Sequence, residues 1–195
     1  MPDFDPDYYQ NQILTARQIR FLQHLKDTRD CLLKAIAGLD EIVLTTEWVI
    51  GDWTIKDLLG HIVSWDDEFR ADIKDILQGE HPGFMRRIDS KDEFNQWNQL
   101  QVSYKRLWTW QRILDDLDRD YREGCRLIYR LHPLDFRRRG VTPWKGAVVD
   151  EPAVLDKEDT DSVETLVTFH WRHTNEHTRQ IEQWKKYRQR KPPSA

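Results

Sequence analysis

The sequence predicts an all-α fold, a four-helix bundle formed by a single domain. Four long segments carry apolar residues at the spacing of one helix face, and no two segments read as paired strands. Glycine, proline and capping residues separate these segments. The chain has 195 residues, which suits one domain and is enough to bury a core without crosslinks.

The first predicted helix runs from about Ala16 to Gly38, because its apolar positions repeat at helical spacing and glycine often follows a helix end. Residues 1–12 are acidic and contain prolines, so we expect a loose tail. The bundle domain is therefore expected to span residues 13–189. Residues 190–195 would form a short C-terminal tail.

The second predicted helix has a clear start. Thr54 is followed three residues later by Asp57, and such a pair can cap two backbone N–H groups reciprocally. An apolar stripe follows, and Gly79 predicts the end of the helix, with a turn at residues 81–83. The connector before it, residues 39–53, holds no strand long enough to found a sheet.

The third helical pattern is unusually long. Ser90 and Glu93 predict its start through a second capping box, and no proline interrupts residues 94–131. A span of about 40 residues exceeds the usual helix length in globular proteins. We therefore expect a kink or a break near Ser103 or Gly124.

Residues 133–160 are rich in glycine and proline and predict a long connection before the last helix. Long connections in compact domains are often lids or walls of sites, and otherwise simply mobile. The sequence leaves both interpretations open. The last helix is predicted to begin near Asp161, with Glu164 three residues later.

Composition excludes several classes of function. The net charge of -4 argues against general nucleic-acid binding, which needs a basic face. The basic run at residues 185–191 is interpreted as a solvated helix end. No signal peptide or apolar span is evident, so a cytoplasmic protein that does not bind membranes is expected. Cys31 and Cys125 are expected to be buried free thiols. The nine tryptophans predict mainly core volume, with a few lining a pocket.

Three histidines in the last predicted helix point to metal chemistry. His173 and His177 are four residues apart, so their rings lie on one helix face and can converge on one ion. His170 and His173 could form a rival pair. Ile181 and Trp184 continue the same stripe, which favours an inward orientation. Imidazoles packed inward cost desolvation unless something holds them neutral, and a divalent cation does so.

Other chemistries lack their motifs. The sequence holds no His-Glu-x-x-His segment, no glycine-rich phosphate loop and no nucleophile motif. His61 lies in an apolar run of the second helix and, taken alone, is most simply a hydrogen-bonded core residue. The residues themselves therefore support a two-histidine metal site and do not connect His61 to it.

Two segments resemble the DinB-like superfamily, which includes the DinB/YfiT and ClbS/DfsB-type proteins. Residues 53–65, Trp-Thr-Ile-Lys-Asp-Leu-Leu-Gly-His-Ile-Val-Ser-Trp, resemble the family's second-helix motif. Residues 173–181 resemble its closing His-x-x-x-His motif. The resemblance implies a bundle with up-down-down-up topology and a divalent metal, commonly nickel or zinc. It places the ligands at His61, His173 and His177 and gives His170 no regular role.

The resemblance also implies a range of activities. Some relatives are transferases that use a low-molecular-weight thiol, and others resemble metal-dependent hydrolases, so we expect an enzyme acting on a small electrophilic molecule. The alternative is a metal-stabilised protein that binds or sequesters a small molecule without turnover. A homodimer is expected by the same resemblance. Four charged residues are candidates for groups that contact the metal's ligands: Asp57, Glu68, Glu176 and Arg179.

Overall fold

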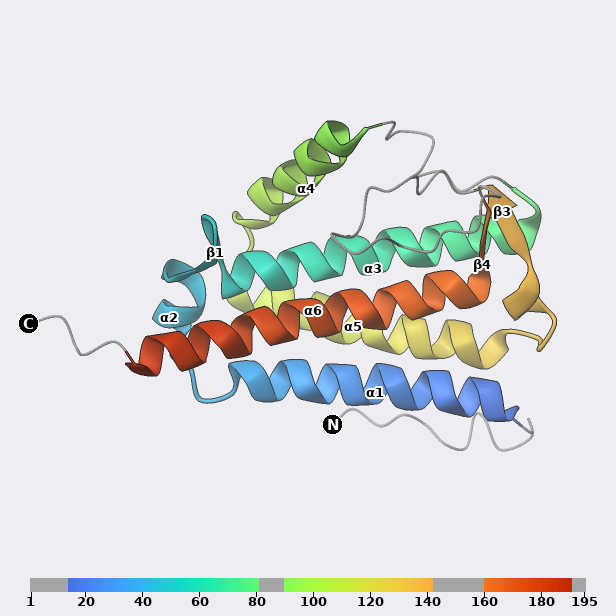
Figure 1. The fold of residues 1–195 in the computed structure, drawn as a ribbon, viewed down its shortest axis with the longest axis horizontal. Helices are drawn as coiled ribbons and strands as arrows, with labels where there is room; N and C mark the ends of the chain where they lie inside the picture. Colours follow the sequence, from blue (N-terminus) through green and yellow to red (C-terminus); the bar gives the residue numbers. More distant parts are fainter. Residues whose placement is uncertain (1–13, 81–89, 142–159, 191–195) are drawn as a thin grey trace, which may run out of the picture.

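The computed structural model describes residues 14–80, 90–141 and 160–190. Four long helices form the bundle (Figure 1): α1 (Ala16–Ile36), α3 (Ile55–Gln78), α5 (Trp110–Arg130) and α6 (Val163–Arg190). α1 and α6 run in one direction, and α3 and α5 run in the other. The predicted all-α bundle with up-down-down-up topology is therefore confirmed. α1 and α3 each pack against both α5 and α6.

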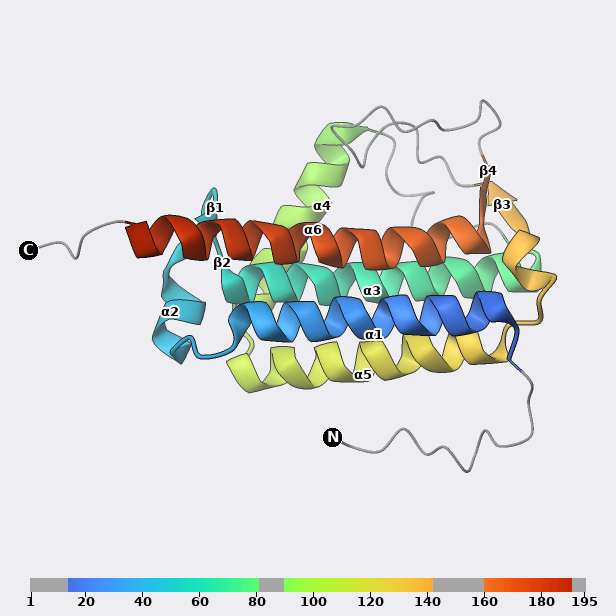
Figure 2. The same ribbon diagram turned by 60° about the horizontal axis from the view of Figure 1, so that its bottom comes forward.

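The shorter elements lie at the ends and side of the bundle. A fifth long helix, α4 (Lys91–Lys105), contacts α3 and leans away from the bundle axis (Figure 2). The remaining elements are α2 (Glu41–Thr46), β1 (Trp48–Ile50), β2 (Trp53–Thr54), a 3-10 turn at Asp135–Arg137, β3 (Arg139–Val141) and β4 (Thr160–Ser162). β1 pairs antiparallel with β2, and β3 with β4.

Local sequence signals fix both ends of α3. The Thr54 backbone N–H donates to Asp57 Oδ2 at 2.9 Å, and the Asp57 N–H donates to Thr54 Oγ1 at 3.2 Å, which confirms the predicted capping box. Gly79 ends the helix in the left-handed region, with φ of 79°, where glycine carries no steric penalty. Between these ends, α3 supplies apolar side chains to both core clusters of the bundle.

The long third pattern is two helices separated by a turn at residues 106–109. The break lies near Ser103, one of the two expected places. Thr109 caps α5 by accepting from the Arg112 N–H at 3.2 Å. Arg106 donates from Nε to Asp57 Oδ1 at 3.1 Å, which ties the turn to the start of α3. Apolar periodicity continues across the turn and could not show that the direction of the chain changes there.

Two other expectations need correction. Residues 41–46 of the connector form the short helix α2, and the residues after it form a small hairpin. Cys125 is buried as expected, but Cys31 is exposed on α1. The expected N-terminal tail, the turn at 81–83, and most of the long connection before α6 lie outside the described residues. Among the described helices, none is long and apolar enough to cross a membrane.

Two helix glycines allow a matched test of packing. A Cβ at Gly124 would lie 3.6 Å from its nearest neighbours, which is ordinary contact, so Gly124→Ala should stabilise the fold by about 0.5–1 kcal/mol through helix propensity. A Cβ at Gly60 would lie 3.2 Å from Lys105 Cβ, so Gly60→Ala should push α4 from α3 and lose that gain. Urea unfolding of both variants measures the difference. Equal stabilisation by both would contradict this packing.

Candidate metal centre

Three histidines converge where α3 and α6 face one another. His61 comes from α3, and His173 and His177 come from successive turns of α6. His173 Nε2 lies 3.1 Å from His61 Nε2 and 3.0 Å from His177 Nε2. One nitrogen from each residue lies within 4.8 Å of the others, so the three could hold one metal ion. The structure thus brings together the three histidines named by the family resemblance.

Aromatic side chains surround the rings. The centroid of Trp53 lies 5.0 Å from that of His61, and the centroid of Trp65 lies 5.8 Å from that of His173. His61 is buried, while His173 and His177 are half-buried. The cluster is therefore surrounded by aromatic groups. Solvent reaches it only partly, at the two histidines of α6. Trp65 itself is almost fully buried, as expected of a core tryptophan, whereas Trp48 is 69% exposed.

The three rings cannot satisfy one another's hydrogen-bonding groups. His177 Nδ1 lies 2.8 Å from Gln180 Oε1, an acceptor, so this nitrogen carries the proton and Nε2 presents a lone pair. His173 Nε2 can donate its proton to that lone pair. Its Nδ1 is then bare, and buried without a hydrogen-bond partner among the described residues, as is His61 Nδ1. A neutral cluster therefore leaves buried nitrogen atoms unsatisfied, which costs free energy.

Burial lowers the pKa of all three histidines. For His61 the largest cause is burial, followed by the charges of His177 and Lys105. For His173 burial is again first, and the neighbouring histidines add to it. For His177 burial outweighs the opposing hydrogen bond to Gln180. The neutral imidazole is the form that binds metals, so this environment keeps the ligands in their binding form.

This effect predicts an unusual pH dependence of metal binding. Because each folded-state pKa lies below the ordinary value of about 6.5, protons should compete with the metal only at pH values lower than that. The affinity for Zn²⁺ should be constant from about pH 8 to about pH 6.5. It should decrease only at lower pH, where the histidines take up protons. Competition with a chromophoric chelator measures this. A tenfold loss between about pH 8 and pH 7 would contradict the lowered pKa values.

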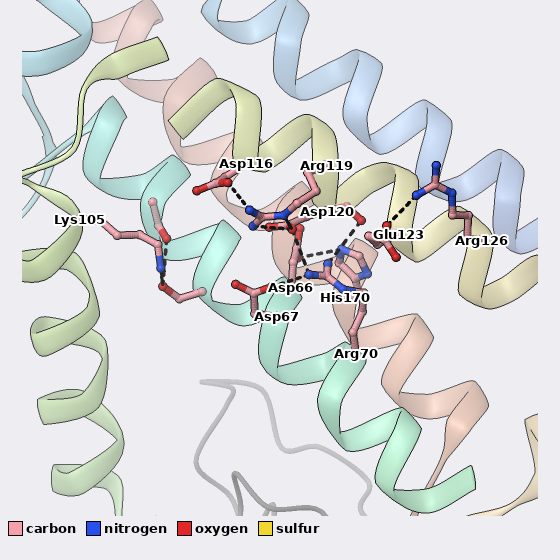
Figure 3. Close-up of polar contacts among 12 residues, drawn as sticks. Asp66, Asp67, Arg70, Lys105, Asp116, Arg119, Asp120, Glu123, Arg126 and His170 are labelled. Carbon is pink, nitrogen blue, oxygen red and sulfur yellow. Dashed lines mark hydrogen bonds and ion pairs between the residues drawn. The ribbon is translucent and has the colours of Figure 1, made fainter. Parts of the chain in front are cut away.

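The fourth histidine lies elsewhere. His170 Nε2 is 2.8 Å from Asp66 Oδ1, and both side chains lie among charged groups between α3, α5 and α6 (Figure 3). This is an ion-pair distance without the alignment of a hydrogen bond, because Asp66 Oδ1 has no hydrogen-bond partner among the described residues. His170 therefore does not form the rival pair with His173, since its ring nitrogen faces a carboxylate.

Three of the four charged residues proposed to support the metal site make contacts elsewhere. Asp57 caps α3 and pairs with Arg106. Glu176 and Arg179 form an exposed pair at 2.6 Å. Glu68 is half-buried on α3, and the cluster of potential ligands found among the described residues contains no carboxylate. Three imidazole nitrogens suit zinc, copper, iron and nickel better than magnesium or calcium, which prefer oxygen.

Sequence reasoning missed two partners. Gln180, which orients His177, lies three residues after it on the same helix face, so its spacing carried the signal. Asp66, which faces His170, is buried on α3 at the helical spacing of the buried residues Ile62 and Phe69. An acidic residue on such a face indicates a buried partner, but the sequence could not show which helix supplies it.

Comparison with known proteins places this site in context. Residues 24–181, most of the chain, match the family model of the DinB superfamily. No curated protein matches the chain. Solved structures of similar fold include an uncharacterized protein from Clostridium difficile 630, with 12% identity, a TM-score of 0.68, and coverage of 89% of this chain and 98% of that one.

Two further solved structures are similar. A protein from Streptococcus pneumoniae has 12% identity and a TM-score of 0.66, with 91% of this chain and 94% of that chain covered. YfiT from Bacillus subtilis, described as a probable metal-dependent hydrolase with an unusual four-helix bundle topology, has 19% identity and a TM-score of 0.65. That similarity covers 92% of this chain and 91% of YfiT. At these identities the similarity shows the fold.

Proposed function

Since this chain belongs to the DinB superfamily, we propose that His61, His173 and His177 bind one divalent metal ion and that the loaded protein hydrolyses a small electrophilic molecule. Nickel and zinc are the proposed metals. The observation that carries the proposal is the convergence of three imidazole nitrogens from two helices, at 3.0 and 3.1 Å for the two closest pairs. The description of YfiT as a probable metal-dependent hydrolase supports the choice of reaction.

The chain's own residues would serve the ion in distinct ways. A divalent ion with three protein ligands keeps open coordination positions and, when bound, supplies Lewis acidity and lowers the pKa of a water molecule. Gln180 Oε1 accepts a hydrogen bond from the Nδ1–H of His177 and so turns the Nε2 lone pair of His177 toward the cluster. Trp53 and Trp65 pack beside the imidazoles and exclude water from that side. His173 and His177 are half-buried, and a substrate would approach the ion from their exposed side.

The function test uses the full chain without a histidine tag, stripped of metal and reloaded separately with Ni²⁺ or Zn²⁺. The protein is incubated with a panel of esters, amides, lactones and epoxides, with and without a thiol. We expect hydrolysis that needs the metal and does not need the thiol. His132→Ala, which changes an exposed histidine, should retain this activity.

Two other outcomes would replace the hydrolase proposal. Product formation that needs both metal and thiol would identify a thiol-dependent transferase. Tight binding of a panel compound by the loaded protein, with no product, would identify a binding or sequestering protein. In either case the metal site would stand, because metal loading is measured separately.

A further inference from the structure

A small, partly open cavity lies between the bundle helices, apart from the three-histidine cluster. Its volume is about 30 Å³, and it shares none of its lining residues with that cluster. Each of the four bundle helices contributes to its wall. The polar residues of the wall are Thr28 and Arg29 of α1, Asp66 of α3, Tyr121 of α5, and His170, Trp171 and Thr174 of α6.

Three of these wall residues hold buried polar atoms without a hydrogen-bond partner among the described residues. These atoms are Arg29 Nε, Asp66 Oδ1 and Trp171 Nε1. The Asp66 side chain is only 5% exposed. Two of the atoms are donors, and Asp66 Oδ1 is an acceptor that lies 2.8 Å from His170 Nε2 without an aligned hydrogen bond.

The wall residues are held firmly in place by other contacts. The Trp171 ring stacks on His24, with centroids 4.9 Å apart. The Arg29 guanidinium carbon lies 4.7 Å from the Tyr121 ring centroid, and Arg29 also pairs with Asp118. In this arrangement the three atoms pair neither with one another nor with any other described residue. Something that both donates and accepts must fill the space if they are to be satisfied.

We propose that this cavity is a binding site for one or two ordered water molecules. A water needs about 10–15 Å³ of such space and two or more polar partners, and both conditions hold here. The water donates to Asp66 Oδ1 and accepts from Arg29 Nε or Trp171 Nε1. Through Arg29 the water links α3 to α1, and through Trp171 it links α3 to the turn of α6 that precedes His173. The rest of the wall is apolar, formed by Leu25, Leu32, Ile62 and Leu117, and without the unpaired polar atoms such a wall would favour a dry cavity.

The test is a crystal structure of the full chain at a resolution that shows ordered water, with a second crystal pressurised with xenon. We expect one or two waters within hydrogen-bond distance of Asp66 Oδ1 and of at least one of the two donors, and no xenon in the cavity. An empty cavity, or one that takes up xenon, would overturn the proposal. Neither result depends on a variant folding.

A matched pair of variants checks the bridging. Trp171→Phe keeps an aromatic ring beside His24 and removes the indole N–H together with the fused five-membered ring, so no side-chain donor remains at this position. Oxygen-17 magnetic relaxation dispersion counts long-lived internal water molecules. Their number should be lower by one in this variant, or the remaining water should lie closer to Arg29 in its crystal structure. Trp184→Phe, on the same helix but outside the cavity wall, should leave both unchanged. A water unchanged in position and number in Trp171→Phe would contradict the bridge to Trp171.

Discussion

Replacing any one of His61, His173 and His177 by alanine should weaken the binding of Ni²⁺ and Zn²⁺ by at least about a hundredfold. Loss of an outer-shell partner typically costs 10–100-fold in metal affinity, and loss of a ligand should cost more. The three losses should be similar, because one nitrogen from each residue points to the same place. Titration of the metal-free protein against a competing chelator measures each affinity.

The controls separate ligand loss from general damage. His132→Ala alters an exposed histidine and should bind metal as the wild type does. Removal of a buried imidazole from the core also tests stability, so each variant should be compared by circular dichroism before titration. Full metal affinity in a folded His61→Ala protein would show that α6 binds the ion alone. That result would agree with the two-histidine site predicted from spacing alone and would refute a ligand role for His61 of α3.

Arg70→Met should destabilise the fold by about 1.5–3 kcal/mol, the usual contribution of a hydrogen bond to a charged group. The loss of a buried charge's only partner would cost more. Arg70 Nη2 lies 3.0 Å from Asp120 Oδ1, and the Asp120 side chain has no exposure to solvent (Figure 3). Arg119 also contacts Asp120, at 3.0 Å, and remains in the variant. Even with both arginines present, burial raises the pKa of Asp120 to about 6.

The cost of Arg70→Met should depend on pH in a definite direction. Without Arg70, the pKa of Asp120 rises further, because the coulombic effect of that guanidinium lowers it. At low pH Asp120 takes up a proton and no longer carries the negative charge that Arg70 stabilised. The destabilisation should therefore be larger at about pH 8 than at about pH 5. Denaturant unfolding at both pH values measures it.

The close-up also offers a control for this prediction. Arg126 pairs with Glu123 on the surface of α5 at 2.6 Å, with about half of each side chain exposed. Arg126→Met should cost only about 0.2–1 kcal/mol, because water screens exposed ion pairs. A similar cost for both variants would mean that the Asp120 environment is not as dry as the geometry indicates.

The fold could be predicted largely because local signals coincide with helix ends. Thr54 and Asp57 marked the start of α3, because their side chains accept hydrogen bonds from the backbone there. Gly79 marked its end through a left-handed backbone conformation. The break between α4 and α5 was harder to place. Arg106 and Thr109 create it through contacts with Asp57 and with the first turn of α5. Such contacts leave the apolar period intact, so the period alone predicts one continuous helix.

The candidate metal site could also be predicted only in part from the sequence. His173 and His177 are on one helix, so their spacing was sufficient to predict that they share a face. His61 is more than a hundred residues away along the chain, and only the packing of α3 against α6 brings it to them. That packing could not be obtained from one sequence by periodicity. The resemblance to a family supplied the expectation, and the geometry places the three side chains together.

Asp120 shows a signal that could have been used. It follows Ile113 and Leu117 at the spacing of the buried face of α5, and this spacing indicates that the acidic side chain is buried there. A buried carboxylate requires a cationic partner, yet periodicity does not say whether Arg70, Lys105 or another cation supplies it. The distances in the bundle assign that role to Arg70 and Arg119.

The central claim is that His61, His173 and His177 hold one divalent ion. The most direct measurement is anomalous scattering from crystals of the untagged full chain, recorded at the nickel and zinc absorption edges at neutral pH. We predict one strong anomalous peak among the three Nε2 atoms, at about 2.0–2.1 Å from each as in zinc–histidine sites. Absence of a peak there after loading with either metal, or a peak bound by only two of these histidines, would contradict the account.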